Sequence, residues 1–235
     1  MKKLVSFGLV SLMLISSLVV IPQTANAQGA GLVSSILNKM ERNWQDLHSL
    51  RSGLVMQKYN AQLKDFDMSF GELQYMPGAG RNSSVRVDWQ KPQRETLTVA
   101  GGEYILFRPR LNMAYKGSTA SGSKTTKVNS VLGFGLNASG AQLKSKFDVE
   151  LAGEGSLEDG GPRVWMLRLT PKGGASYKFA EVWVDQSSGM VIQSRVNEKN
   201  GDSTLVRLTN VQKNARVTPD AFKQQLGSDV KIVKG

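Results

Sequence analysis

The sequence has no cysteine and one histidine, His48, among its 235 residues. Without cysteine the chain forms no disulfide, and it cannot be lipidated at an N-terminal cysteine. The same composition excludes Cys-His catalysis and a multi-histidine zinc site, and it leaves Ser-His-Asp catalysis dependent on His48 alone. Because His48 lies beside the apolar stripe of a predicted helix, we expect it to serve packing or solvation and not catalysis.

Acidic residues are also scarce, with 19 Asp and Glu against 30 Lys and Arg. Two carboxylate pairs, Asp65 with Asp67 and Glu158 with Asp159, fall where loops are expected, so we interpret them as solvated turn residues. The Gly-Ala-Gly sequence at 78–80 precedes a strand and lacks the following helix that a phosphate-binding loop needs. We therefore predict a protein that is not an enzyme and that uses no metal and no cofactor.

The excess of basic residues gives a formal charge of +11. Such a charge favours anionic partners, namely lipid headgroups, lipopolysaccharide or an acidic protein surface. An anionic membrane surface is therefore a candidate partner. Nucleic acid is not expected, because the chain has no aromatic-basic motif for single strands. The alternative is that the charge only keeps an apolar binding protein soluble.

The N-terminal residues have the pattern of an export signal. Two lysines precede an apolar run over residues 4–21, and Ala25-Asn26-Ala27 has the small-x-small pattern of a cleavage site. We predict a signal peptide at residues 1–27, cleaved after Ala27, and a single domain at residues 28–235. A transmembrane anchor is the alternative, but the apolar run is followed at once by Pro22 and polar residues, without a basic cluster.

Alternation of apolar and polar residues predicts strands in the first half of the chain. Val85, Val87 and Trp89 alternate with charged residues, which places the three on one face of a strand. Leu97 and Val99 alternate with threonines in the same way. The Gly-Gly pair that follows is typical of a tight hairpin turn, because such turns need positive φ angles.

About ten short strands are predicted in all, joined mostly by tight turns. A helix over Val33–Leu50 is predicted from an apolar stripe, and residues 131–143 form a second segment of marginal helix or loop character. A sheet of this size is expected to curl. We predict a mainly β (α+β) fold, a curved, incompletely closed antiparallel β-barrel or half-barrel, with these two segments covering its concave face.

The order of the motifs resembles the outer-membrane lipoprotein carrier (LolA-like) family. The segments that carry the resemblance are Val87–Asn112, with its strand, proline, strand and glycine hairpin, then Gly71-Glu72-Leu73, Trp183–Ile192, Leu208–Val211 and Phe222–Val233. Two positions depart from the family pattern. Ile105–Phe107 stand where members often carry tryptophan, and Met76 precedes Pro77 where members often carry an arginine that holds a lid.

The resemblance implies a carrier in the periplasm that shields the acyl chains of lipoproteins or lipids in an apolar cavity during transfer to the outer membrane. It implies acylated lipoprotein or lipid cargo, an inner-membrane releasing complex and an outer-membrane receptor as partners. A periplasmic module of the same fold that senses lipids or lipoproteins is the alternative function. A further alternative is that the apolar residues fill an ordinary core without a cavity.

The predicted site consists of apolar side chains on the concave face. The predicted lipid-binding residues are Val85, Val87, Trp89, Leu97, Val99, Ile105, Phe107, Met113, Tyr115, Leu132, Phe134 and Leu136. Ile105 and Phe107 are included although Tyr104 and Leu106 fit the alternation equally well. The last three residues are separated by glycines, each of which lowers helix stability by about 1 kcal/mol relative to alanine. We therefore expect that segment to cover the empty cavity and to move aside for cargo.

Overall fold

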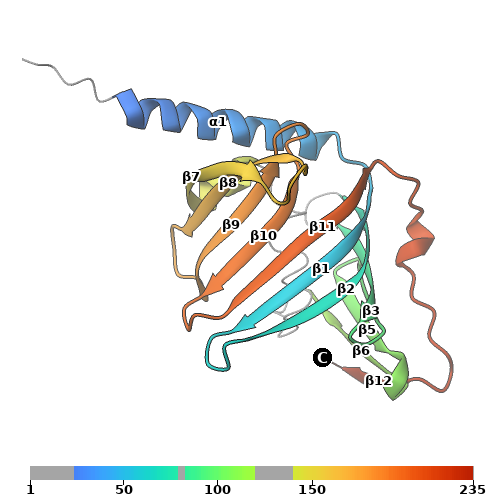
Figure 1. Cartoon of the computed structure of the whole chain (residues 1–235). Coiled ribbons are helices and arrows are strands. Elements are labelled where there is room, and N and C mark those ends of the chain that lie inside the picture. The colour runs from blue at the N-terminus through green and yellow to red at the C-terminus, as the bar shows by residue number, and fades with distance from the viewer. Residues whose placement is uncertain (1–23, 79–82, 120–139, 235) are drawn as a thin grey trace, which may run out of the picture.

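Figure 1 shows the computed structural model, which describes residues 24–78, 83–119 and 140–234. Its twelve strands form one sheet in the order β12-β6-β5-β4-β3-β2-β1-β11-β10-β9-β8-β7. The strands span Leu50–Asn60 (β1), Asp65–Met76 (β2), Ser84–Lys91 (β3), Glu95–Ala100 (β4), Glu103–Arg108 (β5), Met113–Ser118 (β6), Phe147–Ser156 (β7), Arg163–Pro171 (β8), Tyr177–Asp185 (β9), Val191–Glu198 (β10), Ser203–Lys213 (β11) and Lys231–Lys234 (β12). The helices are α1 (Thr24–Gln45) and α3 (Gly140–Lys146), with short 3-10 helices η1 (Pro109–Leu111) and η2 (Pro219–Phe222).

The sheet consists of two meanders that lie side by side. Strands β1 to β6 pair with one another in sequence order, and strands β7 to β11 do the same, every pair being antiparallel. An antiparallel pairing of β1 with β11 joins the two meanders. The sheet curls without closing, since β7 and β12 lie at opposite edges (Figure 1). The predicted curved and incompletely closed antiparallel sheet is thus confirmed.

The end of the chain adds a pairing of another kind. β12 pairs parallel with β6, with Lys231 opposite Met113 and Lys234 opposite Lys116. The chain reaches this edge through residues 214–230, hereafter the C-terminal segment, which runs outside the sheet (Figure 1).

The first helix begins and ends earlier than predicted. α1 ends at Gln45 because the chain turns there and Leu50 already begins β1. Gly53 lies inside β1 at a shift in the register of β1 with β11. A Cβ atom at Gly53 would collide with the side chain of Thr209, so this glycine allows a close approach of two strands.

The two helices cover one part of the concave face. Met40 of α1 follows Ile36 by four residues and Leu37 by three, so the three side chains form a single buried stripe. With Leu143 of α3 they pack against inward side chains of β7 to β10, namely Phe147, Leu167, Leu169, Ala180, Val182, Val184 and Val191. The predicted covering by helices is therefore confirmed for this part of the sheet.

The concave face of the first meander forms a separate apolar cluster, which also includes Val164, Met190, Ile192, Val206 and Leu208 of the second meander. Its buried residues are Leu47, Leu50, Leu54, Met56, Leu73, Tyr75, Val85, Val87, Trp89, Leu97, Val99, Tyr104, Leu106, Val164, Met190, Ile192, Val206 and Leu208. Among the residues that the structure describes, this cluster takes no member from α1 or α3. Within the described residues, the helices therefore pack against the second meander. Residues 131–139, the greater part of the second predicted covering segment, lie outside the described residues.

Candidate functional site

Strands β3 and β4 bring five of the predicted residues together on the concave face. Val85 lies opposite Val99, and Val87 lies opposite Leu97. Trp89 has the same parity as Val85 and Val87, so all five side chains share one face of the sheet. Their exposed fractions are at most 4%. The predicted placement of these five residues is correct.

Strand β5 contributes Tyr104 and Leu106 to this face, and not the predicted Ile105 and Phe107. Leu106 lies opposite Leu97 and Tyr104 lies opposite Val99, so both belong to the concave cluster. Ile105 and Phe107 lie opposite threonines of β4 and point to the outer face. The prediction for these two residues is wrong, because all four residues from Tyr104 to Phe107 are apolar and alternation cannot distinguish the faces. Only the hairpin register decides.

Strand β6 places the last predicted residues of this meander on the same face. Tyr115 lies opposite Leu106 and Met113 lies opposite Arg108, and Tyr115 packs against the concave cluster. Gly117 also belongs to β6 and lies opposite Tyr104. A Cβ atom at this glycine would lie 2.7 Å from a ring carbon of Tyr104, so the missing side chain makes room for the tyrosine ring.

An ion pair interrupts the apolar lining where β4 begins and β5 ends. Nε of Arg108 lies 3.0 Å from Oε1 of Glu95, whose side chain is 7% exposed. The guanidinium group also lies over the ring of Tyr115, 5.2 Å from its centroid. The sequence analysis missed this pair, because Glu95 begins β4 and Arg108 ends β5, and a contact between two strands leaves no periodic signal along the chain. Together the two groups offer a buried acceptor and a partly exposed donor to a polar ligand group.

The remaining predicted residues, Leu132, Phe134 and Leu136, lie outside the residues that the structure describes. The described chain resumes with α3, whose first residue Gly140 packs tightly against α1. A Cβ atom there would collide with the carbonyl oxygen of Leu37. The expectation that this region covers the cavity therefore stays a prediction.

The Trp183–Ile192 motif forms a rigid hairpin that supports α1. Asp185 accepts hydrogen bonds from the hydroxyl groups of Ser187 and Ser188, the latter at 2.7 Å, and from the backbone N–H of Ser188. Burial alone would raise the pKa of Asp185, but these hydrogen bonds outweigh burial and hold the pKa below its ordinary value. Nζ of Lys39 in α1 donates to the carbonyl oxygen of Gln186, which fixes the hairpin to the helix.

The titratable residues singled out in the sequence occupy exposed positions. The backbone N–H of His48 donates to Oδ1 of Asn214 at an exposed turn, and Asp65 and Asp67 are exposed at the start of β2. Within residues 24–78, 83–119 and 140–234, no group of three or more His, Cys, Asp or Glu side chains is arranged to hold a metal ion. In the same part of the chain, no helix combines the length and the apolar character needed to span a bilayer.

Comparison with solved structures shows the same fold in several bacterial proteins. MucB aligns with a TM-score of 0.56 at 17% identity, over 87% of this chain and 66% of that chain. The complex of MucA and MucB from Pseudomonas aeruginosa gives 0.50 at 16% identity, over 86% and 63%. LprF from Mycobacterium bovis gives 0.51 at 13% identity, over 84% and 98%. The chain thus spans a little less than two thirds of the MucB chains that it matches.

Comparison with curated protein sequences gives no match. A family match, by contrast, covers most of the sheet. Residues 57–225 match the family described as outer membrane lipoprotein carrier protein LolA. This range extends from within β1 to the C-terminal segment and includes the whole candidate lining of β3 to β6. The chain therefore belongs to the LolA family of outer membrane lipoprotein carrier proteins.

Proposed function

We propose that the concave face of the first meander binds the acyl chains of lipoproteins or lipids and shields them in the periplasm during transfer to the outer membrane. One observation carries this proposal. The apolar lining of β3 to β6 is built without residues of α1 or α3, which pack against the other meander. An apolar sheet face that does not pack against the described helices is suited to bind an apolar ligand.

The energetics favour an acyl ligand. Each methylene group that leaves water contributes about 0.8 kcal/mol, so a sixteen-carbon chain contributes roughly 10 kcal/mol when it is buried. An acylated protein therefore needs a shielding partner to cross an aqueous compartment. Met113 and Met56 add flexible side chains to the concave face, and such side chains adapt to ligands of different shape.

The proposed partners follow from the same role. Cargo would be an acylated lipoprotein or a lipid, delivered by an inner-membrane releasing complex and received by an outer-membrane receptor. The excess of basic over acidic residues would assist contact with an anionic membrane surface. In this role the protein binds and releases its cargo and catalyses no reaction.

Acyl-chain binding can be tested with a fluorescent sixteen-carbon fatty acid. Val87→Asp places a charge in the lining and should abolish binding, whereas Ile105→Asp places the same charge on the outer face and should leave binding intact. Val99→Phe, which stays apolar but fills space, should weaken binding without adding a charge. Thermal unfolding followed by circular dichroism controls for folding. Equal binding by the wild type and by folded Val87→Asp and Val99→Phe variants would refute the proposal.

A second function is favoured by the likeness to MucB. One solved structure is a complex of MucB with MucA, so a relative of this fold assembles with a protein partner. The corresponding proposal is a periplasmic module that senses lipid or lipoprotein and passes the signal to a protein. The two functions differ in a transfer assay. A carrier moves a labelled lipoprotein from donor to acceptor vesicles in proportion to its concentration, whereas a sensor binds the lipoprotein without delivering it.

A further inference from the structure

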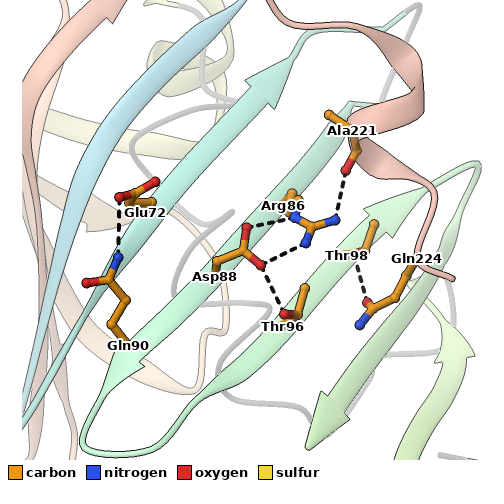
Figure 2. Close-up of polar contacts among 8 residues, drawn as sticks. All are labelled: Glu72, Arg86, Asp88, Gln90, Thr96, Thr98, Ala221 and Gln224. Carbon is orange, nitrogen blue, oxygen red and sulfur yellow. Dashed lines mark hydrogen bonds and ion pairs between the residues drawn. The ribbon is translucent and has the colours of Figure 1, made fainter. Parts of the chain in front are cut away.

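The outer face of the sheet is covered by the chain itself on strands β3 and β4. There Nη1 of Arg86 donates to the carbonyl oxygen of Ala221, and Oγ1 of Thr98 donates to Oε1 of Gln224 at 2.9 Å (Figure 2). Asp88 holds Arg86 in place through two hydrogen bonds of 2.7 and 2.9 Å. Phe222 lies between the residues that make these two contacts, and its exposed fraction is 5%. The C-terminal segment thus shows how a peptide segment binds this face, with one aromatic anchor at the end of η2 between two polar contacts.

Beyond this cover, the outer face presents large apolar side chains to solvent. Phe66, Met68 and Phe70 alternate along β2 and are 54%, 45% and 39% exposed. They lie opposite Tyr59, Gln57 and Val55 of β1. Three large apolar side chains in one exposed row are unusual on the surface of a soluble domain and mark an interaction site.

A groove lies beside this row, hereafter the outer groove. It is lined by Gln57, Tyr59, Phe66, Arg195, Ser203 and Leu205, and has a volume of about 240 Å³. The rings of Tyr59 and Phe66 form one wall, with centroids 4.8 Å apart. Pockets for whole small molecules usually measure about 300–1,000 Å³, so this groove is suited to a single large side chain.

Three arginines and one glutamate lie on the outer face around the outer groove. Glu181 is shared by two arginines, with Arg168 at 3.6 Å and Arg195 at 3.7 Å. Both guanidinium groups also stack on aromatic rings, Arg168 on Phe179 and Arg195 on Trp183. A third arginine, Arg207 on β11, donates to the neutral side chain of Gln193. Arginines held in fixed positions beside aromatic rings attract carboxylates and are typical of protein-binding hot spots.

We propose that the outer groove and the Phe66–Phe70 row bind an extended segment of a partner protein, in which a large apolar side chain is flanked by carboxylates. The apolar side chain would enter the groove beside Tyr59 and Phe66, and the carboxylates would pair with Arg195 and Arg168. A second copy of this chain is disfavoured, because it would bring two arginine-rich surfaces together. A bilayer is disfavoured because the groove accepts one side chain, whereas a membrane surface is broad. This site lies on the face opposite to the proposed acyl-binding lining.

The experiment uses two fluorescein-labelled peptides and the full mature chain. The first peptide is Asp-Asp-Phe-Leu-Asp-Asp, and the second has serines in place of Phe-Leu. Phe66→Ser and Arg195→Glu alter the site. Leu111→Ser and Arg110→Glu are matched controls that alter exposed residues of η1 in the same way. We expect fluorescence anisotropy to show binding of the first peptide, at least tenfold weaker binding of the second, and at least tenfold losses in the two site variants only.

Three outcomes would overturn the proposal. Equal binding of both peptides would indicate attraction by charge alone, and equal losses in the control variants would place the contact elsewhere. The third outcome is that the wild type does not bind the first peptide but binds phosphatidylglycerol vesicles, and that the site variants lose this vesicle binding. The surface would then bind a membrane and not a peptide. Binding of the fluorescent fatty acid should be unchanged in Phe66→Ser, which separates this site from the proposed acyl-binding face. Because Phe66 is 54% exposed, its replacement should leave the fold intact.

Discussion

The two meanders bury their concave faces in different ways. The second meander packs against α1 and α3, so its inward side chains form an ordinary helix-on-sheet core. The first meander has the same alternation of inward apolar residues, but its cluster contains no residue of either helix among the described parts of the chain. The comparison shows that an alternating strand pattern predicts an apolar face and does not reveal what will cover it.

The largest expected effect tests whether the two faces are packed equally well. Leu37→Ala in α1 should lower the free energy of unfolding by about 4–5 kcal/mol, because the surrounding helix-on-sheet core cannot collapse into the cavity. Leu97→Ala in the first meander should cost about 2–3 kcal/mol, because a lining that adapts to ligands relaxes more easily. Both side chains are at most 2% exposed, so the removed contacts are comparable. Urea unfolding measures the two values.

The same pair of variants separates stability from binding. Leu97→Ala should weaken binding of the fluorescent fatty acid, whereas Leu37→Ala should leave the affinity of the folded fraction unchanged. If Leu97→Ala is the more destabilising variant and binding is unaffected, the first meander is an ordinary core and the comparison fails.

A smaller effect concerns the Glu95–Arg108 ion pair in the lining of the first meander. Arg108→Ala removes the arginine of this ion pair with the buried Glu95 carboxylate and should lower the free energy of unfolding by about 1–3 kcal/mol. Arg110→Ala, which alters an exposed arginine two residues away, should change stability far less. Chemical denaturation of both variants gives the difference. A double variant, Glu95→Gln with Arg108→Met, should recover part of the loss, because both charges of the pair are then removed.

The smallest effect belongs to the second meander and depends on pH. Because the folded state lowers the pKa of Asp185, this carboxylate stabilises the protein above its ordinary pKa of 3.8, and the contribution is lost as the pH falls through the folded pKa. Asp185→Asn should therefore be less stable than the wild type at neutral pH, and the difference should shrink as the pH falls below about 4. Thermal unfolding at several pH values measures this difference. A constant difference from pH 7 to pH 2 would contradict it.

The sequence alone determined the inward face of β3 and β4. In Val85, Val87 and Trp89, and again in Leu97 and Val99, polar neighbours leave one parity for burial. The size of the sheet and its curvature also followed, since so many short strands joined by tight turns cannot form a flat sheet. Local patterns of this kind are sufficient wherever one face of a strand is polar.

Tertiary structure decided what these patterns leave open. Residues 104–107 are apolar at every position, so only pairing across the hairpin places Tyr104 and Leu106 inward. The contact of Glu95 with Arg108, and that of the C-terminal segment with Arg86, join residues from different strands or distant parts of the chain. The position of α1 over the second meander depends on how the whole sheet curls. Such contacts leave no periodic signal, because they arise from pairing in space and not from the spacing of residues along one strand or helix.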